Sequence, residues 1–242
     1  MTLTFPTLSS LWQNIRLRWY FKYTLPAKTQ TTLYGVNLDI SMLSSIMKNT
    51  IVEGRYEFQE RRLASRCLNA QDIVLELGGA IGFIGLYCRK VIGVSHHLTV
   101  EANPRTIELM KRNYRLNEIT PQVVHAAAAA ADGEITLDVS GEFWENSIVS
   151  SSSSGEKIQV PSLSLRSLAG MLPQPPTVLI CDIEGAETQL DFSQLPQSVT
   201  RIIIELHPSI VGEGSVQTLV AEIHALGFQT KSVEENTWLF VR

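Results

Sequence analysis

Residues 73–82 read IVLELGGAIG, and they are the most informative part of the chain for its fold class. A short apolar run leads into Glu76 and a glycine-rich turn, and a helical pattern from Phe83 to Tyr87 follows. Strand, turn and helix in this order make the first half of a βαβ unit. The turn is expected at the carboxyl end of its strand, which is where open α/β sheets bind ligands.

Outward from this stretch, short apolar runs keep alternating with helix-length segments. A helix is expected after Pro104, and further strands are expected at residues 98–100, 122–124, 177–181 and 201–206. This alternation predicts an α/β fold with a doubly wound, mostly parallel sheet covered on both faces.

The C-terminal part of the chain departs from this alternation. A helix over residues 216–226 should end at Gly227, because glycine commonly follows the last turn of a helix. Residues 228–233 and 237–241 are predicted to pair as a hairpin, which would place an antiparallel strand at the edge of the sheet.

Two regions are assigned to other parts of the molecule. Residues 1–70 are expected to form a helical cap or accessory segment, and residues 71–242 the main domain. Within that domain a strand is expected at 134–139. A variable loop is expected at about 140–160, because the serines there offer little to bury.

Charge is distributed unevenly along the chain. The net charge is −4, yet residues 1–38 contain four basic side chains and no acidic one, which leaves −8 for the remainder. Apolar side chains recur at helical spacing within residues 8–23. We expect this helix to pack as a cap, and the alternative is a helix that lies on an anionic membrane or on a partner protein.

The composition excludes several classes of protein. A hydrophobic content of 44% excludes a mainly disordered chain, and no apolar run reaches the ~18 residues of a membrane-spanning helix. The negative net charge disfavours a general nucleic-acid binder. Three widely spaced cysteines match neither a disulfide framework nor a zinc site, so a cytoplasmic location is expected.

The glycine-rich turn is the first candidate ligand site. Gly78 and Gly82 allow the backbone to approach a ligand, and a helix N-terminus beyond them attracts anions. The turn is not the G-x-G-x-x-G motif of dinucleotide-binding proteins, because Ala80 and Phe83 occupy two of its glycine positions. Glu76 suits a cationic ammonium better than a pyrophosphate. A tight turn without any ligand is the alternative.

A second acid, Glu101, ends the strand that follows in the chain. A carboxylate at this position accepts hydrogen bonds from the two hydroxyls of a ribose. The alternative is that Glu101 only stabilises the start of the helix near Pro104. Glu76 and Glu101, each at a strand end, together favour a nucleoside ligand.

Two more acidic motifs follow later strands: DIEGAE begins at Asp182, and ELHP begins at Glu205. Strand ends of a parallel sheet share an edge, so these side chains should face one crevice. Asp182, Glu184 and His207 are candidates for taking a proton, and Glu205 should lie on the same side as His207. No ligand set requires a metal, although Asp182 with Glu184 makes one feasible.

The motifs E-x-G-x-x-x-G, VEANP, DIEGAE and IELHP, in this order, resemble the FkbM-type family of S-adenosylmethionine-dependent methyltransferases. The similarity extends from about Tyr56 to about Pro208. It implies the Rossmann-like sheet of class I methyltransferases. The chain departs from the family pattern at Glu76, where aspartate is more frequent, and over residues 142–147.

The resemblance also implies roles for individual residues. Gly78 and Gly82 would approach the methionine part of the cofactor, Glu101 would hold its ribose, and Asn103 would border the adenine together with residues 126–128. Asp182 would lie near the sulfonium and the acceptor, with Glu184 and His207 as the other candidate catalytic groups. The implied cofactor-binding set is Glu76, Gly78, Gly79, Gly82, Glu101, Ala102, Asn103 and Asp182.

The expected activity is therefore O-methylation of a hydroxyl on a sugar, glycolipid or secondary metabolite. S-adenosylmethionine would be the cofactor and S-adenosylhomocysteine the product. Two alternatives stay open: an NAD(P)-dependent oxidoreductase, and a cofactor-binding or membrane-docked accessory protein without catalysis. The expected partner is a small-molecule or glycolipid acceptor rather than nucleic acid, with peripheral membrane or protein contact through residues 8–23.

Overall fold

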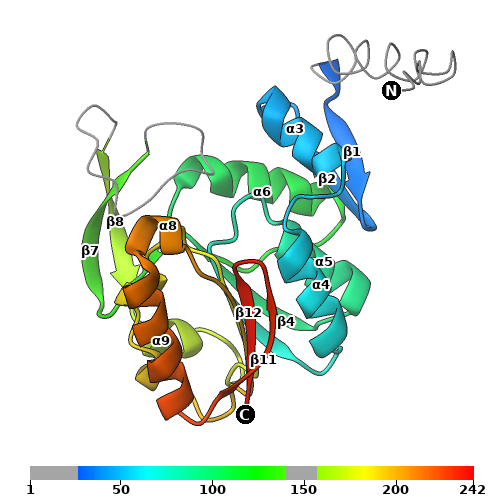
Figure 1. Cartoon of the computed structure of the whole chain (residues 1–242). Helices are drawn as coiled ribbons and strands as arrows, with labels where there is room; N and C mark the ends of the chain where they lie inside the picture. The colour runs from blue at the N-terminus through cyan, green and yellow to red at the C-terminus, as the bar shows by residue number, and fades with distance from the viewer. Residues whose placement is uncertain (1–26, 140–156) are drawn as a thin grey trace, which may run out of the picture. The chain divides into compact units, whose positions relative to one another are not determined.

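The computed structural model describes residues 27–139 and 157–242, which form two compact units, one ending at Tyr56 and one beginning at Glu57 (Figure 1). The division therefore falls earlier than residue 70, where the sequence analysis puts it. The expected helix within residues 8–23 and the segment 142–147 lie outside the described residues.

The described residues of the first unit form a hairpin and the helix α3 (Ser45–Val52). Strands β1 (Gln30–Leu33) and β2 (Val36–Asp39) are antiparallel, and helix α3 follows them. The turn residues Tyr34 and Gly35 both have positive φ, which is the geometry of tight hairpin turns. Residues 30–39 thus pair as strands, although the sequence analysis includes them in a helical segment.

The second unit is built on a seven-stranded sheet in the order β11-β12-β10-β9-β3-β4-β5. All strands run parallel except β12, so the predicted α/β, mostly parallel fold is confirmed. The strands are β3 (Ile73–Leu77), β4 (His96–Glu101), β5 (Val123–His125), β9 (Val178–Cys181), β10 (Arg201–Glu205), β11 (Gln229–Glu234) and β12 (Thr237–Val241).

The antiparallel strand lies inside the sheet, which corrects the expectation that it forms the edge. β12 pairs with β10 on one side and with β11 on the other. Its sequence TWLFV is largely buried, whereas QTKSVE of β11 is mostly exposed. The more apolar strand of the hairpin therefore takes the inner place, and the polar strand becomes the edge.

Helices cover both faces of the sheet. The apolar side chains of α7 and α9 join one core cluster with alternate residues of β3, while α4, α5 and α6 contact strands from the other side (Figure 1). The helices are α4 (Phe58–Cys67), α5 (Phe83–Tyr87), α6 (Pro104–Leu116), α7 (Leu165–Ala169), α8 (Pro208–Val211) and α9 (Glu213–Ala225). None of the described helices is long and apolar enough to cross a membrane.

A three-stranded sheet is formed by β6 (Ala127–Ala128), β7 (Gly133–Asp138) and β8 (Lys157–Leu163). Strand β7 was predicted, but β8 begins inside the segment predicted as a loop. Its sequence KIQVPSL contains Ser162 and Pro161, which weaken the strand pattern. Antiparallel pairing with β7 along its whole length defines it as a strand.

The parallel strands define where a ligand can bind. The strands β3, β4, β5, β9 and β10 have the spatial order 3-2-1-4-5 of a doubly wound sheet. The direction in which successive strands are added to the sheet therefore reverses between the adjacent parallel strands β3 and β9. Ligands of such sheets bind beyond the carboxyl ends of the strands at this reversal. The predicted site residues lie at or directly after these carboxyl ends.

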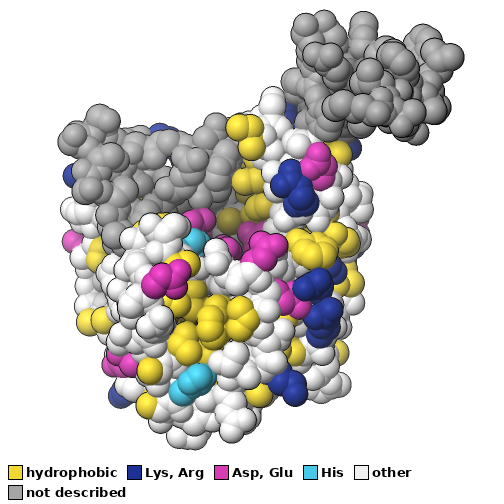
Figure 2. Space-filling model, viewed as in Figure 1, with side chains coloured by type: hydrophobic (Ala, Val, Ile, Leu, Met, Phe, Trp, Pro, Cys, Tyr) yellow, Lys and Arg dark blue, Asp and Glu magenta, His cyan; other side chains and the backbone are white. Residues whose placement is uncertain are grey.

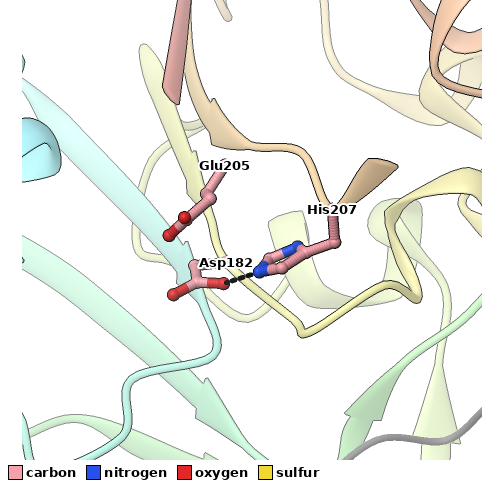
Figure 3. A group of neighbouring side chains, drawn as sticks. All are labelled: Asp182, Glu205 and His207. Carbon is pink, nitrogen blue, oxygen red and sulfur yellow. Dashed lines mark ion pairs between the residues drawn. The ribbon is translucent and has the colours of Figure 1, made fainter. Parts of the chain in front are cut away.

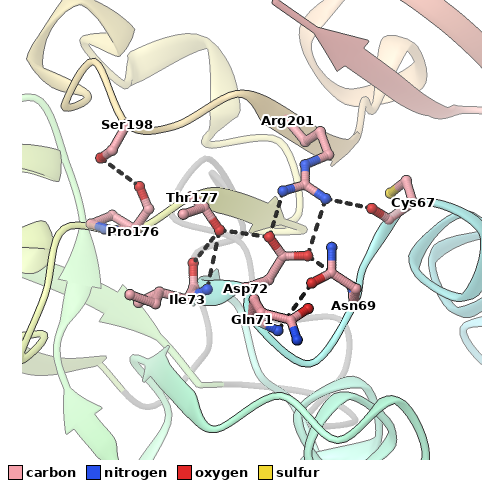
Figure 4. A network of polar contacts seen from close by, with 9 residues as sticks. All are labelled: Cys67, Asn69, Gln71, Asp72, Ile73, Pro176, Thr177, Ser198 and Arg201. Atoms are coloured by element: carbon pink, nitrogen blue, oxygen red, sulfur yellow. Dashed lines mark hydrogen bonds and ion pairs between the residues drawn. The ribbon is translucent and has the colours of Figure 1, made fainter.

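The opposite side of the sheet, where these parallel strands begin, carries a network of polar contacts (Figure 4). Asp72, just before β3, accepts hydrogen bonds from both terminal nitrogens of Arg201, from Thr177 Oγ1 at 2.8 Å and from Asn69 N at 2.8 Å. Arg201 Nη1 also donates to the carbonyl of Cys67. The network joins the beginnings of β3, β9 and β10.

Candidate active site

The glycine-rich turn after β3 lies directly against the segment after β9. Gly78 has φ +80°, and a Cβ there would collide with the backbone carbonyl of Asp182, whose amide donates to Leu77 O at 3.0 Å. Gly82 has φ +83°, and a Cβ there would lie 2.7 Å from Met110 Cγ. Contacts within the protein therefore require these glycines, independently of any ligand.

Gly79 is likewise enclosed by protein, since a Cβ would collide with the Thr99 side chain. The amides of Gly78 and Gly79 donate to Val100 O at 2.9 and 3.3 Å, which fastens the turn to the end of β4. Ala80 adopts φ +42°, an uncommon conformation for alanine. The turn is thus held in a single conformation by its neighbours.

Glu101, the last residue of β4, is held by the backbone on both sides. Its Oε2 accepts from Ala80 N at 2.9 Å and its Oε1 accepts from Asn103 N at 2.8 Å. Burial raises the pKa of this carboxyl although these hydrogen bonds oppose the shift. Oε1 also accepts from Thr106 Oγ1 at 3.5 Å. Each carboxylate oxygen has about two acceptor positions, so Oε2 keeps one for a ligand hydroxyl.

Glu76 lies beneath the turn instead of at its open side. The residue is 2% exposed, and its Oε2 accepts from Thr99 Oγ1 at 2.6 Å and lies 3.6 Å from His97 Nε2. Burial raises the pKa of Glu76 to about 7 and lowers that of His97 to about 3. The structure therefore places Glu76 in a buried polar pair, and not among the acids near Asp182.

The residues expected near a nucleoside base follow β4 and β5. Asn103 is buried, and its side-chain oxygen accepts from Arg105 N at 2.9 Å, so it caps helix α6. Its side-chain nitrogen has no partner within the described part of the chain. Ala102 is partly buried, and Ala126 N donates to Glu101 O at 3.1 Å. These residues border Glu101, as expected from the strand order.

Four side chains surround His207, the residue that caps helix α8. His207 Nε2 lies 3.6 Å from Asp182 Oδ1 and 3.4 Å from Glu184 Oε2, and its Nδ1 lies 3.2 Å from Glu187 Oε1. Glu205 completes the group, with an oxygen within 4.8 Å of donor atoms of Asp182 and His207. Figure 2 shows acidic side chains gathered around a histidine on the face in view.

The acids change the protonation of the group. Burial alone would lower the pKa of His207, but Glu187, Asp182 and Glu184 outweigh it and raise that pKa to about 9. Burial and the charges of Glu205 and Glu184 raise the pKa of Asp182. Burial and Glu60 raise the pKa of Glu205 to about 7. Crowded carboxyls with raised pKa values are typical of functional sites.

The structure thus brings together all three predicted catalytic candidates, Asp182, Glu184 and His207, and confirms that Glu205 lies near His207. Sequence reasoning gave no role to Glu187, which is 1% exposed and accepts from Ile183 N and Gly185 N. Its position inside an irregular turn follows no periodicity. The second acid of DIEGAE, Glu184, has φ +52°, which marks the turn as conformationally unusual.

Comparisons with known proteins were made at the levels of sequence and structure. No family model matches the chain, and no curated protein does. Among solved structures, TrmK of M. capricolum in complex with S-adenosyl-homocysteine aligns with a TM-score of 0.42 and 8% identity, over 76% of this chain and 66% of that chain. TYW2 of M. jannaschii in complex with AdoMet gives 0.44 and 16%, over 88% and 84%.

A third similar structure is the tRNA (uracil-54, C5)-methyltransferase of Pyrococcus abyssi in complex with S-adenosyl-L-homocysteine. It gives a TM-score of 0.45 and 11% identity, over 88% of this chain and 43% of that chain. The chain spans less than two thirds of TrmK and of this enzyme. Identities this low and TM-scores below 0.5 transfer no activity, so the function has to be argued from the site itself.

Proposed function

We propose that this chain is an S-adenosylmethionine-dependent methyltransferase that methylates a hydroxyl of a sugar, glycolipid or secondary metabolite. The observation that carries the proposal is the position of Glu101. Its carboxylate ends β4, is fixed by Ala80 N and Asn103 N, and lies beside a turn that is packed on Asp182. The Glu101 carboxylate and the crowded acidic group thus lie at the carboxyl ends of β4 and β9, the two strands that flank β3.

The cofactor-binding residues we propose are those that border Glu101 and the turn. Glu101 would accept from the ribose hydroxyls, with Oε2 offering the remaining acceptor position. Ala102 and Asn103 would border the adenine, and the backbone of the Gly78–Gly82 turn would border the methionine part. Glu76 would support this turn from below, since its carboxyl is buried against Thr99.

The charge of the crevice favours this cofactor over a dinucleotide. Asp182, Glu184, Glu187 and Glu205 lie around a single histidine, so acidic groups outnumber basic ones in this site. The cofactor supplies a methyl group on a positively charged sulfonium, and negative side chains attract such a charge. A pyrophosphate would be repelled by them, which argues against the oxidoreductase alternative, as does the missing glycine motif.

Methylation of a hydroxyl also needs a group that accepts the hydroxyl proton. The raised pKa of His207, about 9, means that its ring already carries a proton near neutral pH. We therefore assign proton acceptance to the carboxylates Asp182 and Glu184, with His207 holding them in place. Positioning of the two reactants in this partly buried crevice would supply most of the rate enhancement.

The acceptor we propose is a small molecule. The chain has 20 basic and 24 acidic side chains, whereas binding to nucleic acid depends on neutralising phosphates with basic groups. A glycolipid acceptor fits if residues 8–23 contact a membrane surface, as proposed from their sequence. A cytoplasmic location is part of the same proposal.

Calorimetric titration with S-adenosylhomocysteine, NADH and NADPH tests the cofactor. We expect binding of S-adenosylhomocysteine alone; binding of a nicotinamide nucleotide alone would instead support the oxidoreductase. Transfer of a labelled methyl group into a metabolite extract, a lipid extract and bulk tRNA then tests the acceptor class. Label in tRNA only would contradict a small-molecule acceptor, and cofactor binding without any transfer would support the accessory protein.

A further inference from the structure

The group formed by Asp182, Glu205 and His207 has a feature that proton transfer does not explain. The three residues come from the ends of two neighbouring strands, β9 and β10, and point toward one another (Figure 3). One donor atom from each side chain lies within 4.8 Å of the others. Two carboxylate oxygens and one imidazole nitrogen are thus arranged around a common point.

We propose that Asp182, Glu205 and His207 bind a divalent first-row metal ion. Carboxylate oxygens suit Mn²⁺ and imidazole nitrogen suits Fe²⁺ and Zn²⁺, so the mixed set fits ions of this series. At metal–ligand bonds of about 2.1 Å, ligand atoms of one ion lie up to about 4.2 Å apart. The 3.6 Å between Asp182 Oδ1 and His207 Nε2 already fits, and Glu205 needs only a small side-chain adjustment.

The surroundings of His207 provide an independent argument. Its other ring nitrogen, Nδ1, lies 3.2 Å from Glu187 Oε1, and the Glu187 side chain is 1% exposed. Glu187 is itself fixed by the amides of Ile183 and Gly185. Histidines that bind metals almost always give their second ring nitrogen to a carboxylate, which orients the ring. Here Glu187 Oε1 lies within ion-pair distance of Nδ1, although not in hydrogen-bond geometry, and Nε2 faces Asp182.

The atom that Nε2 faces is also unusual. Asp182 Oδ1 is buried, and it has no hydrogen-bond donor among the described residues. Glu187 Oε2 is in the same situation. A buried carboxylate oxygen without a donor is costly unless a cation compensates it.

The charges of the side chains around this group also favour a bound cation. Within residues 27–139 and 157–242, no lysine or arginine forms an ion pair with Asp182, Glu187 or Glu205. His207 is the ion-pair partner recorded there for both Asp182 and Glu187. A divalent ion would replace the proton on Nε2, release it to solvent, and add positive charge to the group.

A metal at this point would have open coordination positions for an acceptor oxygen. It would then lower the pKa of the acceptor hydroxyl, and the half-exposed Glu184 would take the proton. This role in catalysis rests on the proposed function, whereas binding of the ion does not.

The test is binding of Mn²⁺ to the full chain after removal of metals with EDTA. Titration followed by electron paramagnetic resonance should show one tight site, and spin-echo spectra should show a directly coordinated imidazole nitrogen. Glu205→Gln should weaken binding at least about 10-fold, and Glu187→Gln about 10- to 100-fold. Glu222→Gln, the same change on the exposed face of α9, should leave binding unchanged.

S-adenosylhomocysteine affinity, measured on the same samples, separates this inference from the proposed function. Unchanged affinity in Glu205→Gln shows that the variant is folded. Lack of S-adenosylhomocysteine binding by the wild-type chain would contradict the methyltransferase and leave the metal result standing. Absence of Mn²⁺ and Zn²⁺ binding at millimolar concentration, lack of nitrogen coupling, or equal affinity in Glu205→Gln and Glu222→Gln would each overturn the metal site.

Discussion

In the seven-stranded sheet, the side where the parallel strands begin (the amino edge) and the side where they end (the carboxyl edge) differ in how their charged groups are paired. At the amino edge, Asp72 meets Arg201 in a two-fold contact, and Thr177 and Asn69 satisfy the remaining acceptor positions of the carboxylate (Figure 4). At the carboxyl edge, acids face one another around His207, and Asp182 Oδ1 has no donor among the described residues (Figure 3).

The difference shows that the amino edge stabilises the fold, whereas the carboxyl edge carries the reactive groups. Opposite charges with complete hydrogen bonding fix the beginnings of three strands at the amino edge. Like charges at the carboxyl edge raise pKa values and leave acceptors unpaired, which costs stability but prepares the site for a cation. Ala80 and Glu184, both at the carboxyl edge, also have positive φ.

The largest expected effect of breaking this pattern is on turnover. Asp182→Asn keeps the shape of the side chain but removes its charge, so methyl transfer should fall by about 10²- to 10⁴-fold. Affinity for S-adenosylhomocysteine should change by less than about 3-fold, because Asp182 would act mainly on the reacting atoms. A near-normal rate in a labelled-methyl assay would remove Asp182 from the reaction centre.

At the amino edge, Asp72→Ala should lower the free energy of unfolding. It leaves the Arg201 guanidinium, which is 20% exposed, without its carboxylate, and loss of one partner of a buried pair costs about 3–5 kcal/mol. The free energy of unfolding in urea measures this loss. Asp182→Asn is the matched control, and it should not reduce stability because a carboxyl with a raised pKa gains from losing its charge. Equal losses in both variants would contradict the contrast between the edges.

Glu101→Ala tests the proposed nucleoside contact next to the acidic group. Hydrogen bonds to a charged group contribute about 1.5–3 kcal/mol, so affinity for S-adenosylhomocysteine should drop by that amount. Calorimetric titration measures it, with Glu222→Gln as the exposed control. Wild-type affinity in Glu101→Ala would rule out the ribose assignment.

The smallest expected effect is the pH dependence of stability. The pKa of Glu205 is raised in the folded chain from 4.5 to about 7, so the folded state keeps this proton longer than the unfolded state. Stability should therefore fall as the pH rises through this range. The raised pKa of His207 adds stability that is present below 6.5 and is lost as the pH rises through about 9.

Glu205→Gln isolates the first of these contributions. The variant cannot ionise at this position, so its stability should fall less than that of the wild type between pH 4.5 and 7. Urea unfolding at several pH values measures the slope, and Glu222→Gln should keep the wild-type slope. The idea fails if Glu205→Gln and the wild type share the same pH profile.

Most of the sheet could be predicted from the sequence, because strands buried on both faces are continuous apolar runs. Strands β3, β4, β5, β9 and β10 were all found in this way. Strand β8 was missed because Pro161 and the buried Ser162 interrupt its pattern of apolar residues. The inner position of β12 was missed because a hairpin pattern does not say which strand docks, although its apolar content gave a usable signal.

The candidate site was predicted in part. Residues that follow strand ends, such as Glu101, Asp182 and His207, were found because parallel strands end at a shared edge. The direction of Glu76 was not predictable, because a strand buried on both faces does not reveal which side chain turns away from the crevice. The role of Glu187 also escaped, since only the irregular turn after β9 brings its carboxylate to His207.

The α/β class, the order of the elements and the strand ends that carry acids follow from local patterns of apolar and polar residues along the chain. Which of these acids meet depends on contacts between distant segments. Pairing of β9 with β10 brings Asp182 close to Glu205 and His207. The turn packs so closely on the backbone of Asp182 that there is no room for a side chain at Gly78. Such contacts join distant parts of the chain, so no local pattern encodes them.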